Sequence, residues 1–148
     1  DETAIAHGDY RPGNLLIHPT EARIIGVLDW ELSTLGHPLA DLAYNCQIYH
    51  LGERYPGPAM ARADLAGMPS EADYLAAYCR RTGRDGIADW PVFLAFSFFR
   101  GAAIGAGVYR RGLDGNAADA QALERGALYK LFAEIGWDIA QGRAPAFL

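Results

Sequence analysis

The chain has 148 residues, of which 51% are hydrophobic and 21% are charged, and its formal net charge is −5. This composition is that of one ordinary globular domain, and it excludes a disordered chain. The acidic balance, without a cluster of lysine and arginine, excludes non-specific binding to nucleic acid through phosphates.

Signals for export or membrane insertion are absent from the pattern. The first twenty residues lack a basic start followed by an apolar block, so no secretory signal is predicted. The most apolar stretch, Val92–Tyr109, carries Arg100 near its middle, which would cost roughly 2.5–3.5 kcal/mol in a bilayer. Cys46 and Cys79 are predicted to be small buried side chains of a reducing compartment. We therefore expect a cytoplasmic protein without a membrane span.

The first elements in chain order are short strands. Thr3–Ala6 is one candidate strand, and Leu15–His18 and Arg23–Leu28 are two more, rich in Leu, Ile and Val. The turn signal Pro19–Ala22 separates the second strand from the third, so these two should form a hairpin. Pro38 then marks the start of a helix predicted over Leu39–Tyr49.

The rest of the chain is predicted to be helical after a loop over Gly52–Met68. Ser70, Asp89 and Asn116 are the expected N-caps of three further helices. These helices are expected over Glu71–Thr82, Trp90–Arg111 and Ala117–Ala140. The glycine-rich run Gly101–Gly107 lies inside a helical pattern, so it is interpreted as a face for close helix packing rather than a phosphate loop. The predicted fold class is α+β, a mostly helical unit fronted by a small β-hairpin.

Three oxygen-bearing side chains are placed to meet at one end of this hairpin. Asp9 and Asn14 flank the turn formed by Pro12 and Gly13, and Asp29 follows the strand paired with the one that Asn14 begins. Carboxylate and amide oxygens suit Mg²⁺, which shares its remaining positions with water and substrate phosphates. A second carboxylate nearby can accept a proton from an attacking hydroxyl, and these are the parts that phosphoryl transfer requires.

The motif His7-Gly8-Asp9, followed by Asn14 and by Asp29-Trp30, resembles the catalytic and metal-binding segments of the protein-kinase-like superfamily. Within that superfamily it looks like the aminoglycoside phosphotransferase family of small-molecule kinases. The segments Leu28–Tyr44 and Phe93–Arg100 are similar to the phosphotransferase domains that accompany acyl-CoA dehydrogenases. The resemblance implies an ATP- and Mg²⁺-dependent transferase with an alcohol group as acceptor.

The same resemblance implies a role for each matching residue. Asp9 would be the catalytic base, and Asn14 and Asp29 would be ligands of Mg²⁺. Arg11 would stabilise the charge that develops on the transferred phosphate. His7 and Asp41 would be structural, His7 packing beneath the metal-binding segment and Asp41 accepting hydrogen bonds from the backbone of the catalytic loop.

Simpler interpretations of some of these residues stay open. Arg11 could be a solvated loop cation, and Asp41 could be an ordinary first-turn acid favoured by the helix dipole. His18, His37 and His50 lack the spacing of a zinc site and are expected in loops or at the surface. The role of Glu31, which replaces the glycine of Asp-Phe-Gly, also stays open.

The family places its nucleotide between two lobes, and the first lobe supplies a glycine-rich loop and a lysine. Only eight residues precede Asp9, and the single lysine of the chain is Lys130 in the last predicted helix. We therefore expect residues 1–148 to be the C-terminal lobe of a longer kinase, with the nucleotide-binding lobe absent. Alone it should bind ATP poorly and transfer little phosphate, and its uncovered apolar cleft should favour self-association.

The acceptor is predicted from charge on the long helix. No acidic residue occurs from Trp90 to Leu113, whereas Arg100, Arg110 and Arg111 do. Arg100 is therefore a candidate for the substrate pocket, and a hydroxyacyl thioester or a similar anionic or apolar hydroxylated small molecule fits better than a polycation. Two alternatives remain, an aminoglycoside kinase and a kinase-like module that binds without chemistry.

Overall fold

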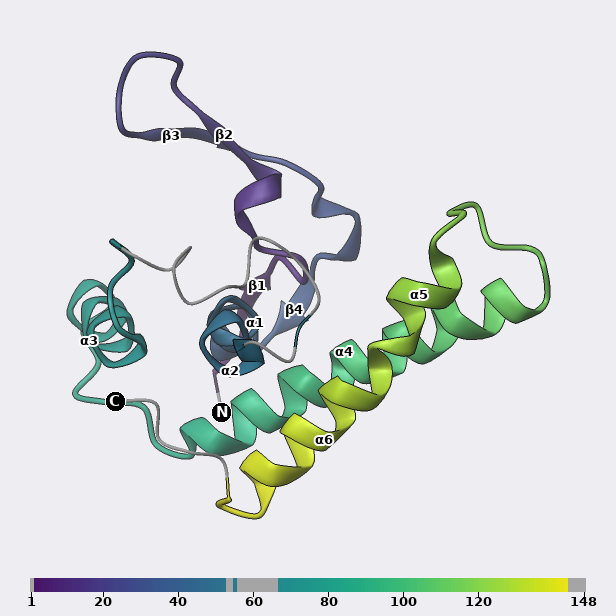
Figure 1. Cartoon of the computed structure of the whole chain (residues 1–148). Helices are drawn as coiled ribbons and strands as arrows, with labels where there is room; N and C mark the ends of the chain where they lie inside the picture. Colours follow the sequence, from purple (N-terminus) through teal and green to yellow (C-terminus); the bar gives the residue numbers. More distant parts are fainter. Residues whose placement is uncertain (1, 53–54, 56–66, 144–148) are drawn as a thin grey trace. The chain divides into compact units, whose positions relative to one another are not determined.

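The computed structural model of the protein describes residues 2–52, residue 55 and residues 67–143. These residues form two compact units, Asp1–Asn45 and Cys46–Leu148. Figure 1 shows that the strands belong to the first unit and that the long helices belong to the second.

The first unit contains two small antiparallel sheets. β2 (Leu15–Ile17) pairs with β3 (Ile24–Val27), which confirms the predicted hairpin. β1 (Ala4–Ala6) pairs with β4 (Thr34–Gly36), a strand that the sequence analysis did not predict. A strand of three residues between two turns has too little alternation to be recognised from its sequence. The pairing of β4 with β1 brings together the two ends of the segment that contains Asp9, Asn14 and Asp29.

The helix predicted over Leu39–Tyr49 is divided in two. α1 covers Leu39–Cys46 and α2 covers Ile48–Leu51, with Gln47 between them. The backbone N–H of His50 donates to the carbonyl of Gln47 three residues earlier, so the helix tightens at this point.

The second unit begins its longer helices with α3, which confirms the predicted bounds and caps. α3 covers Glu71–Thr82. Ser70 Oγ accepts the N–H of Asp73 at 3.1 Å and donates to the Asp73 carboxylate at 2.7 Å. Gly83 ends the helix in the left-handed conformation, with φ of 70°. Of the loop predicted before α3, over Gly52–Met68, the greater part lies outside the described residues.

α4 covers Trp90–Leu113 and is the longest helix described. Asp89 is the N-cap residue, as predicted, but its side chain makes no cap bond, and its carbonyl accepts the N–H of Val92 instead. Pro91 lacks an N–H, so the first turn has fewer donors to cap. By length and composition alone α4 could span a membrane, a test that core helices of soluble proteins also pass. The absence of a membrane span therefore stays a prediction.

The last predicted helix is two helices, α5 (Ala122–Ala127) and α6 (Tyr129–Ala140), and the predicted cap at Asn116 is wrong. Asp119 forms the start instead, since its carboxylate accepts the N–H of Gln121 at 2.9 Å and its carbonyl accepts that of Ala122. This turn competes with helix formation before residue 122.

Glycines let the helices of the second unit approach closely. α5 and α6 lie along α4 (Figure 1). A Cβ atom at Gly101 would lie 2.7 Å from the ring of Phe132, and one at Gly126 would lie 2.5 Å from the backbone of Tyr109. The interpretation of the glycine-rich run as a packing face is confirmed at Gly101. The core beside these contacts consists of six buried residues: Cys46, Leu51, Leu94, Phe98, Ile135 and Ile139.

His50 does not lie in a loop or at the surface, contrary to expectation. It belongs to α2, and only 9% of its side chain is exposed. Its Nε2 lies 3.0 Å from the Glu71 carboxylate, and the same carboxylate accepts the indole N–H of Trp90. This cluster joins α2, α3 and the start of α4, and it replaces the interactions with water that a surface histidine would make.

Candidate active site

The polar loop between β1 and β2 is held at one end of the β2–β3 hairpin. Leu15 pairs with Val27 in the hairpin, and the backbone N–H of Leu28 donates to the carbonyl of Asn14 at 2.8 Å. Asn14, which ends the short 3-10 helix η1 (Pro12–Asn14), and Asp29 therefore leave the hairpin at the same end. This is the relative placement that the sequence predicted for them.

Asp9 accepts three side-chain hydrogen bonds. Its Oδ2 accepts from Nδ2 of Asn14 at 2.8 Å and from Nε of Arg11 at 3.1 Å. Its Oδ1 accepts from the hydroxyl of Tyr44 at 2.8 Å. The carboxylate is thereby oriented from both of its oxygens, with 22% of its side chain still exposed.

These bonds favour the ionised form of Asp9. Burial raises the pKa of the Asp9 carboxyl, but the hydrogen bonds from Tyr44, Arg11 and Asn14 and the charge of Arg11 together outweigh it. The pKa of Asp9 therefore lies below its ordinary value. The group is an ionised carboxylate near neutral pH, which is the form that can accept a proton.

Asn14 is buried, and the nitrogen and the oxygen of its side-chain amide have different roles. Its Nδ2 donates at 2.8 Å to the backbone carbonyl of Asp9 and at 2.8 Å to the Asp9 carboxylate. Both amide hydrogens are thus directed at Asp9. The amide oxygen has no hydrogen-bond partner among the described residues, so it is available to a cation.

Asp29 starts the short 3-10 helix η2 (Trp30–Leu32) in a strained conformation. Its φ of 66° lies in the left-handed region, which is uncommon for residues other than glycine. The pKa of Arg11 is raised, mainly by its hydrogen bond with Asp9 and by the Asp9 charge, with a smaller contribution from the charge of Asp29. The Asp29 carboxylate is therefore within electrostatic range of this loop. Strain of this kind is held at functional sites more often than elsewhere.

His7 joins the two segments that carry the motif residues. Its side chain is 3% exposed, and its Nδ1 accepts the N–H of Asp9 at 3.2 Å. The proton therefore lies on Nε2, which donates to the carbonyl of Leu28 at 2.8 Å. The imidazole also contacts the Trp30 ring, with centroids 4.6 Å apart. A neutral histidine fits this position, because one nitrogen accepts while the other donates.

α1 holds the loop through one face. The Asp41 carboxylate accepts the N–H of His7 at 2.6 Å and that of Gly8 at 2.8 Å. Asn45 donates to the carbonyl of Tyr10 at 2.7 Å, and Tyr44 donates to Asp9. Positions 41, 44 and 45 are three and four residues apart, so they share a helix face.

The sequence analysis missed Tyr44 and Asn45. The signal that could have found them is their spacing from Asp41, since polar groups at the third and fourth positions after a loop-binding acid face the same loop. Tyr44 lay inside the segment that carried the resemblance, but no chemistry was assigned to its hydroxyl.

Arg11 lies beside Asp9, although 54% of its side chain is exposed. Its Nε makes the ion pair with Asp9, and a Cβ added at Gly13 would lie 3.0 Å from its Nη1. Gly13 thus leaves room for the guanidinium. The described contacts leave the terminal nitrogens Nη1 and Nη2 without a hydrogen-bond partner, and such nitrogens can bind a phosphate.

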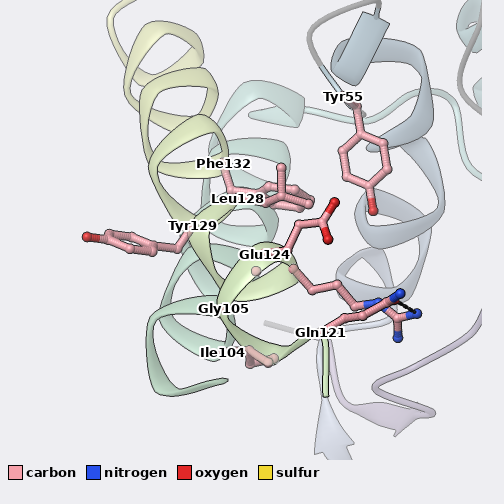
Figure 2. Close-up of a pocket in the computed structure, with 10 residues that line it drawn as sticks. Tyr55, Ile104, Gly105, Gln121, Glu124, Leu128, Tyr129 and Phe132 are labelled. Atoms are coloured by element: carbon pink, nitrogen blue, oxygen red, sulfur yellow. Dashed lines mark hydrogen bonds between the residues drawn. The ribbon is translucent and has the colours of Figure 1, made fainter. Parts of the chain in front are cut away.

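The second unit contains a pocket of about 640 Å³. Figure 2 shows its aromatic and apolar side chains, among them Tyr55, Leu128 and Phe132, with the Glu124 carboxylate beside them. The Arg125 guanidinium on its rim donates to Gln121 and to Asp119. The described residues that line this pocket do not include Arg100, so its place in a substrate site stays a prediction.

The donor set of the loop fits a magnesium ion bound jointly with a nucleotide. The described residues contain no group of three or more His, Cys, Asp or Glu side chains that could bind a metal. Mg²⁺ needs no such group, since it keeps several waters and is bound by one or two protein oxygens together with phosphates. The amide oxygen of Asn14 and the carboxylate of Asp29 would be the two protein oxygens of such a site.

Small antiparallel sheets that present this loop, followed by helices, match part of a kinase-like phosphotransferase fold. Comparison with known proteins gives the family. The chain belongs to the phosphotransferase enzyme family, whose model matches residues 1–96.

Relatives and a solved structure agree with this assignment. The chain is 45% identical over 141 residues to mouse acyl-CoA dehydrogenase family member 10, covering 93% of this chain and 13% of that protein. It is 42% identical over 146 residues to chicken acyl-CoA dehydrogenase family member 11, covering 95% of this chain and 19% of that protein. A "putative aminoglycoside phosphotransferase" from Ralstonia eutropha has a similar structure, with a TM-score of 0.85 and 49% identity over 95% of this chain. The chain spans 43% of that structure, so it matches less than half of each of these proteins.

Proposed function

We propose that the chain carries the catalytic base and the metal ligands of an ATP- and Mg²⁺-dependent phosphotransferase that acts on a hydroxyl group of a small molecule. The observation that carries this proposal is the contact between Asp9 and Asn14. Asn14 directs both amide hydrogens at Asp9, which orients the base and leaves the amide oxygen for a cation. A structural loop would need neither feature.

In this proposal particular atoms of each residue take part in the transfer. The Asp9 carboxylate accepts the proton of the acceptor hydroxyl, and the free guanidinium nitrogens of Arg11 stabilise charge on the transferred phosphate. Asn14 Oδ1 and the Asp29 carboxylate would hold Mg²⁺. When bound, the ion would neutralise charge on the nucleotide phosphates. His7 and Asp41 hold the loop backbone in place.

For the acceptor we propose a hydroxyacyl thioester or a similar anionic or apolar metabolite. Two of the relatives are named acyl-CoA dehydrogenase family members, and α4 carries three arginines and no acid. An aminoglycoside is the second candidate, because the Ralstonia protein carries that name. A polycation would need carboxylates, and Glu124 is one acid that lines the pocket of the second unit.

The test uses the full-length gene product that contains this chain. Wild type and the Asp9→Ala variant are assayed for Mg²⁺-dependent ATP turnover with hydroxyacyl-CoA thioesters, free hydroxy acids and aminoglycosides. We expect turnover by wild type with a thioester and a loss of at least about 100-fold in Asp9→Ala. Removal of Mg²⁺ with EDTA should abolish turnover.

Equal inactivity of the two proteins across the whole panel would favour a module that binds a metabolite or partner without chemistry. Turnover with aminoglycosides alone would support the phosphotransferase activity and contradict the proposed acceptor. The 148-residue chain by itself should bind ATP poorly and transfer little phosphate, so it serves as a further comparison.

A further inference from the structure

The two oxygens of the Asp9 carboxylate are not equivalent. A carboxylate offers about four acceptor positions, two on each oxygen. Oδ2 accepts from both Arg11 and Asn14, whereas among the described residues Oδ1 accepts only from Tyr44. One acceptor position therefore remains, and it lies on Oδ1.

Tyr44 belongs to the same rigid frame as the loop that it contacts. Asp41 on α1 binds the backbone N–H groups before Asp9, and Asn45 binds the carbonyl of Tyr10 after it. The hydroxyl of Tyr44 extends from the same face of α1 to the carboxylate. Backbone and carboxylate are thus positioned from one helix, and rotation of the Asp9 side chain would break the bond at Oδ1.

We propose that Tyr44 is a positioning residue, whose hydroxyl fixes the Asp9 carboxylate so that the open position of Oδ1 faces the acceptor hydroxyl. This inference rests on the proposed function. In the transfer step, the acceptor oxygen forms a bond to the γ-phosphorus of ATP, and the bond from that phosphorus to the ADP oxygen breaks with its electron pair on ADP. The acceptor proton passes to Oδ1 of Asp9 and then to solvent, and Tyr44 keeps its own proton.

Tyr10 provides a matched control. It is adjacent to Asp9 in the chain, and its ring lies edge-on to His7 with centroids 6.0 Å apart. Among the described contacts its hydroxyl has no hydrogen-bond partner. Tyr10→Phe therefore removes a hydroxyl from the same loop without removing a contact to the carboxylate.

The first experiment measures kcat and KM in the full-length gene product for wild type, Tyr44→Phe and Tyr10→Phe. The acceptor is the compound of the panel above that wild type phosphorylates fastest. If wild type phosphorylates none of them, hydrolysis of ATP is measured, with water as the acceptor. We expect Tyr44→Phe to lower kcat by about 10- to 100-fold with KM and melting temperature nearly unchanged, because misplacement of a reacting group acts on the transition state. Tyr10→Phe should keep the wild-type values. A Tyr44→Phe variant with wild-type kcat would overturn the inference.

The second experiment does not depend on activity. The side-chain amide of Asn14 donates to Asp9, so its NMR signals in the 148-residue chain report on the carboxylate. Tyr44→Phe should shift these signals, and Tyr10→Phe should leave them in place. Unchanged signals in Tyr44→Phe would show that the hydroxyl does not restrain Asp9, and the inference fails.

The two experiments separate the two proposals. Shifted signals together with an inactive wild type would keep the restraint on Asp9 and overturn both the phosphotransferase and the catalytic part of this inference. An active wild type, an inactive Asp9→Ala and a fully active Tyr44→Phe would keep the phosphotransferase and overturn only the role of Tyr44.

Discussion

The imidazole of His7 donates from Nε2 to the carbonyl of Leu28, 2.8 Å away and 21 residues later in the chain. This bond ties the loop that carries the proposed base to the strand end that carries a proposed metal ligand. Both groups belong to the first unit, so the bond can be tested in the isolated chain.

His7→Phe should destabilise the first unit, although the phenyl ring is similar in size to the imidazole that it replaces. The substitution leaves the carbonyl of Leu28 and the N–H of Asp9 without their partners, and each unsatisfied buried group costs about 1–3 kcal/mol. Urea denaturation of the 148-residue chain measures the loss. His18→Phe is the control, since His18 bonds only to exposed groups, and it should change the free energy of unfolding by less than about 0.5 kcal/mol. Equal stability of both variants would show that the His7 bonds contribute nothing.

Gly8→Ala should be more destabilising than Gly83→Ala, although both glycines have positive φ. At Gly83 a Cβ would meet no atom within 4 Å, so only the left-handed conformation is penalised, by about 1–2 kcal/mol. At Gly8, with φ of +84°, a Cβ would also lie 2.6 Å from the carbonyl oxygen of Leu32. The difference between the two variants in urea denaturation isolates this clash. We expect Gly83→Ala to be the more stable of the two variants. The reverse order would contradict the close approach of η2 to the loop.

The fold and the site differ in how much could be predicted from the sequence. The hairpin and α3 were predicted correctly because alternation, turn residues and caps are local signals. β4 was missed because it depends on its pairing with β1. The break between α5 and α6 at Leu128 was also missed.

The candidate site follows the same division. The placement of Asn14 and Asp29 at one end of the hairpin could be predicted, because strand pairing determines it. The spacing from Asp41 indicates that Tyr44 faces the loop, but the contact of its hydroxyl with Asp9 could not be predicted, because it depends on how α1 is rotated toward the loop. The burial of His50 was missed for a similar reason, since its partner Glu71 is 21 residues away.

The two cysteines should differ in reactivity. Cys46 is fully buried, and burial, with a smaller contribution from the Glu71 charge, raises the pKa of its thiol well above the ordinary value. Cys79 is only partly buried. The thiolate is the reactive form, so an Ellman titration at pH 8 should detect one thiol in the native chain and two after denaturation. Cys79→Ser should remove the native signal and Cys46→Ser should keep it. Rapid reaction of Cys46 would contradict the packing of the core in the second unit.

The 148-residue chain should self-associate through the sheet of β1 and β4. Ile5 and Leu35 are cross-strand neighbours in this sheet, and they are 69% and 74% exposed. Exposed apolar side chains on short edge strands favour association. Leu35→Lys should therefore lower the apparent mass in light scattering at high concentration. Gln141→Lys adds the same positive charge at an exposed position of the second unit and should not lower it. A wild type that stays monomeric would contradict the prediction.

The bonds that α1 makes to the loop have a consequence for how this site can be transferred. The backbone of residues 7–10 is fastened by groups that all lie within the first 45 residues of the chain. A short cassette can therefore carry the loop geometry into another protein, provided that the register of α1 is preserved. One residue inserted between Asp41 and Tyr44 would turn Tyr44 by about 100° around the helix axis, so that Asp41 and Tyr44 would no longer face the same loop.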